Sequence, residues 1–396
     1  MKNKLTFEHT LIACYLGFIS QAIIVNLAPL LFITFRSEFN IPLAQITLLV
    51  TVNFLVQLLT DLIAAFTVDK VGYRISAFLA HIFCALGLIA MAVLPDIMDP
   101  FGGLLIAVIL YAIGGGLIEV LASPIAEACP TKNKEATMSL LHSFYCWGQV
   151  FVVLASSLFF LVFGTESWRT LSFAWAVIPS FNAIFFLFVP LNKLVETGEG
   201  MKIGSLLTDK RFWFFALLIF AAGASEHSMN QWSSSFAESS LGVSKTLGDI
   251  LGPCMYAASS GLARVLDAKP NKKHPLITLM MGGSLIAVAS YLLAAFSPVP
   301  LLALISCGIC GFGVGILWPG VCSLAAASIK TGGTAMFAFL ALAGDLGCSL
   351  GPTAVGLVSS AFGDELRYGL SFSTIFPLLL FILLFVTQKK SKRDLS

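Results

Sequence analysis

Long apolar stretches alternate with short polar connections along the whole chain. A helix that crosses a bilayer needs about 20 predominantly apolar residues, and the chain offers twelve stretches close to this length, six on each side of its longest polar connection. The pattern therefore predicts twelve transmembrane helices. The expected spans are residues 10–34, 44–68, 75–94, 101–128, 138–163, 168–190, 212–236, 246–266, 275–296, 300–327, 333–361 and 369–387.

The spans form two matching sets, which predicts an all-α membrane protein built from two pseudo-symmetric six-helix bundles. Ala65-x-x-x-Asp69 ends the second expected span, and Ala263-x-x-x-Asp267 ends the eighth, 198 residues later. Parallel repeats of this kind are one known plan for transporters. The expected domains are an N-terminal bundle over residues 1–190, a cytoplasmic linker over 191–210, a C-terminal bundle over 211–388 and a basic cytoplasmic tail over 389–396.

The composition supports membrane insertion, because 58% of the residues are hydrophobic and only 11% are charged, far from the balance of a soluble domain. The short connections leave no room for a folded soluble domain. The sequence shows no nucleophile with its base, no phosphate-binding loop and no metal-ligand cluster, so we expect no enzymatic activity, no cofactor and no metal. The net charge of +2 comes with no basic groove, so no nucleic-acid partner is expected.

Basic residues near the span ends set the orientation, because Lys and Arg concentrate on the cytoplasmic side of membrane proteins. With the N-terminus inside, 19 of the 23 Lys and Arg residues fall on the cytoplasmic side. Arg36, Arg169, Lys245 and Arg367 fall on the other side. We therefore expect a multi-pass protein of the cell membrane with both termini in the cytoplasm. On this interpretation every basic residue, Arg264 included, lies in a connection or tail.

Four carboxylates, by contrast, lie inside apolar stretches: Asp61, Glu119, Glu226 and Asp345. A carboxylate at the centre of an inserted helix costs about 2.5 to 3.5 kcal/mol, so such groups normally face a protein interior or a watered cavity. With no basic partner expected inside the membrane, we interpret all four as candidates for proton coupling. The same asymmetry favours a neutral or cationic solute over an anion.

The loop after the second span carries a family signature. It reads Ala65-Phe-Thr-Val-Asp69-Lys-Val-Gly72-Tyr-Arg74, which resembles the loop 2–3 signature of the major facilitator superfamily, with Ala65 where that family usually has Gly. With twelve spans and a central loop, the resemblance covers the whole chain. It implies that Asp69, Gly72 and Arg74 control conformational switching and do not touch substrate; the alternative is a solvated loop.

A narrower resemblance rests on spans 4, 5 and 7. Span 4 reads Gly114-Gly-Gly-Leu-Ile-Glu119, a Leu-His142 pair lies at span 5, and Gly223-Ala-Ser-Glu226 lies in span 7 with Trp232. These segments look like the fucose:proton symporter group, although that group usually has Asn where Ser123 stands here, and span 1 has no acid. The resemblance implies a small-molecule solute and protons as partners within the lipid bilayer. We expect a monomer.

Glu119 is the leading candidate for proton coupling, because it lies near mid-depth in a helix whose glycines let neighbours approach closely. The alternative is a structural acid bonded to a neighbouring helix. Span 7 is unusually polar, and polar groups at membrane depth need water or ligand as a partner. We therefore expect Glu226, Asn230, Gln231 and Trp232 to bind substrate, with helix packing as the alternative.

Other polar and aromatic residues complete the expected site. Asn53, Gln57 and Asp61 recur every four residues and so share one helix face, which we expect to line the pathway. A structural role is equally open for Asp61, and for Asp345. The further substrate-binding candidates are Gln21, Asn26, His142 and Trp318, since sugars bind well to amides and aromatic faces.

The first hypothesis is a secondary active transporter that works by alternating access and couples protons to symport of a small polar solute such as a sugar. The alternative is a proton-coupled antiporter that exports amphipathic or cationic drugs, for which intramembrane acids are equally suitable. The Gly-Pro signature that such antiporters carry in span 5 is missing between His142 and Gly148. A non-transporting membrane sensor is disfavoured, because the polar residues of the cavity are kept.

Overall fold

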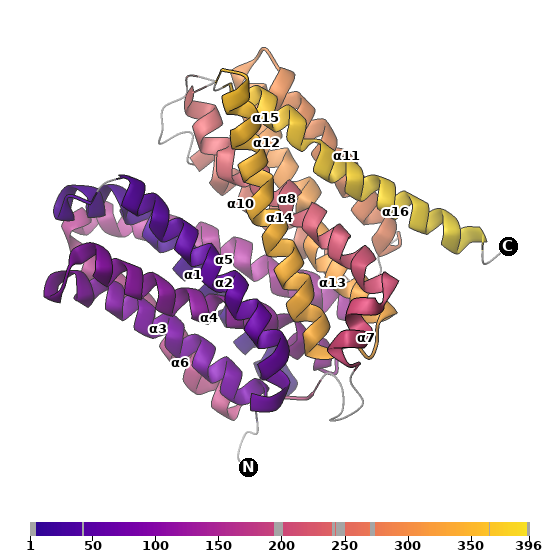
Figure 1. Cartoon of the computed structure of the whole chain (residues 1–396), viewed down its shortest axis with the longest axis horizontal. Helices are drawn as coiled ribbons and strands as arrows, with labels where there is room; N and C mark the ends of the chain where they lie inside the picture. Colours follow the sequence, from indigo (N-terminus) through magenta and orange to yellow (C-terminus); the bar gives the residue numbers. More distant parts are fainter. Residues whose placement is uncertain are drawn as a thin grey trace. The chain divides into compact units, whose positions relative to one another are not determined.

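The computed structural model describes residues 5–41, 43–193, 201–239, 242, 250–269, 274–363 and 365–393, almost all of them helical (Figure 1). Within these residues, eleven helical segments are long and apolar enough to cross a membrane. In the first part of the chain the helices are α1 (Phe7–Phe39), α2 (Leu43–Val71), α3 (Tyr73–Ile97), α4 (Pro100–Ala128), α5 (Lys134–Phe163) and α6 (Trp168–Phe188), with a short turn η1 (Thr165–Ser167) before α6.

In the second part of the chain several expected spans are interrupted. The described part of the eighth span is a π-helical turn, η2 (Ile250–Cys254), that continues into α10 (Met255–Asp267), and residues 246–249 lie outside the described residues. The described part of this span is not among the eleven segments. The remaining helices are α7 (Ile203–Thr208), α8 (Lys210–Ser239), α11 (Leu276–Phe296), α12 (Pro300–Val314), α13 (Leu317–Ser328), α14 (Gly333–Ala361), α15 (Leu366–Ser373) and α16 (Ile375–Arg393).

The tenth expected span breaks between α12 and α13 for a local reason. In a continuous helix the carbonyl of Gly315 would accept from the backbone N–H four residues later, but that residue is Pro319, which has none. The helix ends at Val314 and restarts at Leu317. The break leaves the Gly315 carbonyl available to a side chain.

Two compact units divide the chain. The first contains Met1–Lys132, Trp147–Met201 and Thr331–Phe339, and the second contains Asn133–Cys146, Lys202–Lys330 and Leu340–Ser396. Helix α5 therefore begins in the second unit and ends in the first. The expected domain boundaries around the linker 191–210 stay a prediction; residues 194–200 of that linker and 394–396 of the tail lie outside the described residues.

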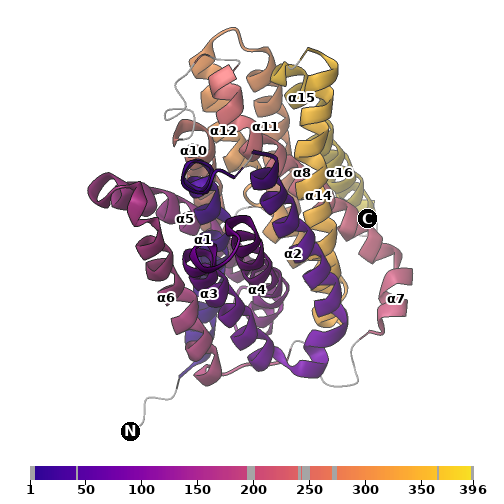
Figure 2. The same cartoon turned by 60° about the vertical axis from the view of Figure 1, so that its left-hand side comes forward.

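In the first unit α3 lies between α4 and α6 (Figures 1 and 2). Glycines bring these backbones together: a Cβ built on Gly114 of α4 would lie 2.6 Å from the carbonyl oxygen of Ala80 and 2.7 Å from the amide of Cys84, both in α3. A side chain at this position would force the helices apart. The glycine run that the sequence shows ahead of Glu119 is therefore a close helix contact.

A cluster of charged residues around Arg169, at the start of α6, connects three helices of the first unit. Its guanidinium contacts Asp96 of α3 at 2.6 and 2.7 Å and Glu38 of α1 at 2.7 Å. The indole of Trp168 donates to Glu38 at 2.8 Å, and Arg169 lies over the Trp168 ring, 4.4 Å from its centroid. This cluster joins α1, α3 and α6 through partly exposed charges.

Candidate functional site

The first unit brings together two of the residues named from the sequence. The side-chain amide of Gln21 in α1 donates to Oε2 of Glu119 in α4 at 2.8 Å. Gln21 is buried and Glu119 is half-buried. A carboxyl group bonded to an amide keeps this acceptor role in both protonation states, so the arrangement suits a group that gains and loses a proton.

The polar face of α2 packs on the glycine run of α4. A Cβ on Gly115 would lie 2.9 Å from Nε2 of Gln57, and one on Gly116 would lie 3.2 Å from Oδ1 of Asp61. Asp61 is fully buried, and Asn53, one turn before Gln57, is also buried. Gln57 and Asp61 therefore pack on glycines one turn before Glu119. A role for this face in the pathway stays a prediction.

In the second unit, Glu226 of α8 is bound to a buried arginine. Nη2 of Arg264 contacts Oε1 and Oε2 of Glu226 at 3.0 and 3.2 Å, with side-chain exposures of 3% for Arg264 and 13% for Glu226. The expectation that the intramembrane acids have no basic partner is therefore wrong for Glu226. Arg264 lies near the end of α10, and helical side chains lean toward the N-terminus, so its long side chain carries the charge back into the interior.

Arg264 also bonds to two other helices. Its Nε donates to the freed carbonyl of Gly315 at 2.6 Å, and its Nη1 donates to the carbonyl of His142 at 2.9 Å and contacts Sγ of Cys146 at 3.0 Å. The guanidinium thus satisfies acceptors from α5, α8 and the α12–α13 break. His142, expected to bind substrate, is buried, and its backbone is what the arginine holds.

Aromatic candidates in the second unit lie in helix contacts. The indole of Trp232 in α8 donates to the carbonyl of Pro352 in α14 at 2.9 Å. Trp318 of α13 packs on Gly344, next to Asp345, and a Cβ on Gly223 would lie 3.2 Å from its ring. These positions join α8, α13 and α14.

The remaining amides differ in surroundings. Gln231 is exposed and Asn230 is half-buried, whereas the amide of Asn26 donates to the Ala22 carbonyl of its own helix at 2.8 Å. The substrate-binding roles of these amides, and of the tryptophans, stay predictions.

The loop between α2 and α3 is built on Gly72, whose φ of +92° suits a residue without a Cβ. Asp69 is exposed at the end of α2. Arg74 donates to the carbonyls of Phe186 and Val189 at 2.9 and 3.0 Å, and so caps the last turn of α6. Arg74 therefore links this loop to α6; switching by the loop stays a prediction.

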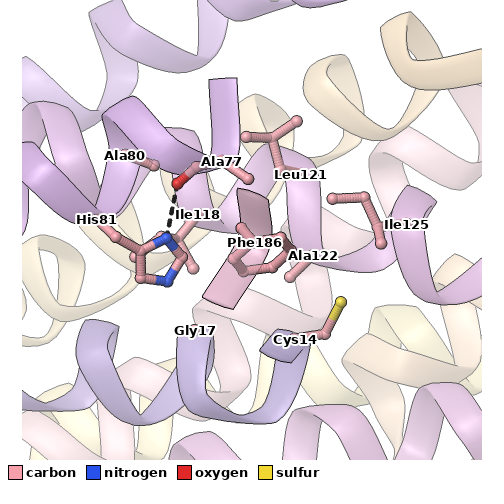
Figure 3. Close-up of a pocket in the computed structure, with 10 residues that line it drawn as sticks. All are labelled: Cys14, Gly17, Ala77, Ala80, His81, Ile118, Leu121, Ala122, Ile125 and Phe186. Carbon is pink, nitrogen blue, oxygen red and sulfur yellow. Dashed lines mark hydrogen bonds between the residues drawn. The ribbon is translucent and has the colours of Figure 1, made fainter. Parts of the chain in front are cut away.

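A small cavity in the first unit lies beside His81 of α3 and Cys14 of α1 (Figure 3). Nδ1 of His81 donates to the Ala77 carbonyl at 2.7 Å, so its Nε2 accepts from the amide of Asn182 at 2.8 Å. With a volume of about 10 Å³, the cavity has space for one water and not for a solute. Within the described residues no cluster suited to a metal ion is present.

The family model of the Major Facilitator Superfamily matches residues 13–352. The chain belongs to the major facilitator superfamily. Members of this superfamily move small solutes across a membrane and are generally not enzymes. No match was found among curated proteins.

Solved structures of this superfamily share the fold. FucP, the E. coli fucose:proton symporter, has a TM-score of 0.79 at 16% identity over 96% of this chain and 98% of its own. The proton:xylose symporter XylE has a TM-score of 0.78 at 15% identity, covering 96% and 95%. The human organic anion transporter MFSD10 has a TM-score of 0.74 at 14% identity, covering 95% and 99%. The predicted family and the all-α major facilitator fold are thus confirmed, and eleven of the twelve predicted spans are found among the described residues.

The sequence did not identify Arg264 as part of the site. One signal was available: position 264 lies inside the expected span 246–266, two residues before its end. Tyr256 was also missed; its hydroxyl donates to the backbone carbonyl of Glu226 at 2.9 Å. Pro319, which frees the Gly315 carbonyl, directly follows Trp318 in the sequence.

Proposed function

We propose that this superfamily member is a proton-coupled symporter of a small polar solute such as a sugar. The observation that carries the proposal is the half-buried Glu119, held by Gln21 beside the close contact of α2 with the glycines of α4. Such a carboxyl group can load and release a proton without losing its hydrogen bond to Gln21. The structural likeness to FucP and XylE, both proton symporters by name, supports this choice.

The test uses the purified protein in proteoliposomes. With an acid exterior, wild type should concentrate the correct solute, and L-fucose and D-xylose are the first probes of a wider panel. Glu119→Gln should retain solute exchange but lose accumulation, because a permanently neutral side chain cannot carry the proton. Glu166→Gln, which neutralises an exposed acid before α6, is the control. Unimpaired accumulation by Glu119→Gln would contradict the proposal.

Export of cationic compounds is the second candidate, favoured by the fully buried Asp61 at the α2–α4 contact. An acid held at membrane depth suits a cationic solute as well as a proton. Cells that express the protein should then resist cationic compounds, and Asp61→Asn or Asp345→Asn should abolish the resistance. Unchanged resistance across a broad panel would count against export.

We place the protein in the plasma membrane, as a monomer, with both termini in the cytoplasm. Moving Arg264 from the loops into the interior leaves eighteen basic residues against four, so the charge asymmetry that supports this orientation persists. A C-terminal tag that is accessible to protease from outside intact cells would contradict it.

A further inference from the structure

Helix α5 belongs to both compact units, and the change falls between Cys146 and Trp147. Three residues in its first part, Ser139, His142 and Cys146, contact the same residue of the second unit. Arg264 donates to the His142 carbonyl and contacts Cys146, and its own backbone carbonyl accepts from the hydroxyl of Ser139 at 2.9 Å. Cys146 also contacts the hydroxyl of Ser260 at 3.6 Å.

This attachment shares its guanidinium with Glu226. The carboxylate bonds to Nη2, while the α5 groups bond to Nη1. Glu226 is the more exposed partner of the pair, at 13% against 3% for Arg264. Neutralising Glu226 would leave a buried cation held by neutral groups alone, which is costly.

The internal repeat provides an uncharged counterpart. Phe66 of α2 lies 198 residues before Arg264, the same offset that relates Asp69 to Asp267. In the first unit Phe66 packs edge-to-face on Phe339, in the first part of α14, with ring centroids 6.0 Å apart. This contact is therefore aromatic where the contact of Arg264 with α5 is ionic, and neither phenyl ring titrates; the hydroxyl of Tyr73 also bonds to Thr334 in the same part of α14.

We propose that Arg264 is a positioning residue that makes the attachment of α5 to the second unit depend on the charge of Glu226. With Glu226 ionised, the guanidinium is fixed and holds the α5 segment Lys134–Cys146. With Glu226 neutral, through a proton or a solute, the hold weakens and α5 is released. The inference rests on the proposed function, since a proton-coupled cycle needs a contact that opens and recloses.

Other ionisable groups face this pair and enter the design of the test. His142 and Cys146 lie on α5, Tyr256 on α10, Cys310 on α12 and His227 on α8 itself, and each interacts electrostatically with Glu226 or Arg264. His142→Gln and His227→Gln variants therefore accompany the Glu226 variant.

Cys146 reports release directly, because its thiol is buried in the junction. Alkylation of the full-length protein in nanodiscs by N-ethylmaleimide, quantified by peptide mass spectrometry, is compared at neutral and acid pH. Each rate is divided by that of the unfolded protein at the same pH, which removes the thiol's own pH dependence. Cys84, buried in the first unit, detects global unfolding.

The normalised rate at Cys146 should rise in wild type on acidification. In Glu226→Gln it should be about tenfold higher at neutral pH, the change expected from losing one hydrogen bond to a charged group, and should not rise further in acid. Arg264→Lys should lie between them, since an ammonium lacks the planar fork of the guanidinium. Phe66→Leu, His142→Gln and His227→Gln should keep the wild-type pH response.

Equal rates in wild type and Glu226→Gln would overturn the inference, as would an acid response that persists in Glu226→Gln or disappears in either histidine variant. These outcomes are independent of the flux assay. Concentrative uptake lost in Glu119→Gln, with Cys146 indifferent to Glu226, would leave the proposed function standing and defeat the inference. An acid response at Cys146 without uptake of any solute would defeat the function alone.

Discussion

Glu119 in the first unit and Glu226 in the second each follow glycine within a predicted span, Gly116 and Gly223 respectively, yet their surroundings differ. The amide of Gln21 binds Glu119, and the guanidinium of Arg264 binds Glu226. The first carboxyl keeps its hydrogen bond to Gln21 when its charge changes. The second is half of a buried ion pair. Its neutralisation leaves the Arg264 cation buried without an anion, which destabilises the fold. Similar sequence signals thus give one site suited to proton exchange and one suited to holding helices together.

Arg264→Ala should produce the largest effect. Removing one member of a buried ion pair costs about 3 to 5 kcal/mol, and the carbonyls of Gly315 and His142 lose a donor as well. Thermal unfolding of the protein in detergent should show a large drop in midpoint. Arg211→Ala, which removes a 58% exposed arginine that is paired with Asp209, is the matched control and should change little.

The double variant Arg264→Met with Glu226→Leu sharpens this result. Apolar residues often replace a buried ion pair without loss of stability. The double variant should therefore unfold at a temperature close to that of wild type. A double variant no more stable than Arg264→Ala would show that the bonds to Gly315 and His142 matter more than the charge pair.

The next effect separates the two carboxylates. Glu226→Gln leaves the Arg264 charge without its anion, whereas Glu119→Gln still offers a carbonyl oxygen to Gln21. We expect Glu226→Gln to lower the free energy of unfolding by about 3 kcal/mol and Glu119→Gln by less than about 1 kcal/mol. Thermal unfolding of both variants tests this difference. Equal losses of stability would contradict the assignment of different roles to Glu119 and Glu226.

The sequence predicted the helices because span length and apolar composition are local properties. It also named both Gln21 and Glu119, since polar residues at membrane depth stand out against an apolar background. Arg264 was missed because span-end counting assigns a basic residue to the loop by its Cα, whereas its side chain extends back along α10. The Arg264–Gly315 bond needed three-dimensional information as well: Pro319 shows that a carbonyl is freed but not which donor reaches it.

The smallest effect is expected at the other arginine cluster, around Arg169. It tests whether burial determines how much an arginine contributes to stability. Arg169 binds Asp96 and Glu38, but the three side chains are 27%, 47% and 34% exposed. Exposed ion pairs contribute about 0 to 1 kcal/mol each and are screened by salt, so Arg169→Ala should lower stability by about 1 kcal/mol. High salt should reduce the difference in stability between wild type and Arg169→Ala. The stability difference caused by Arg264→Ala should persist, because the buried pair is shielded from ions. If Arg169→Ala lowered stability as much as Arg264→Ala, and high salt did not reduce the loss, burial of the charge would not decide how much an arginine contributes. Its contacts between helices would decide it instead.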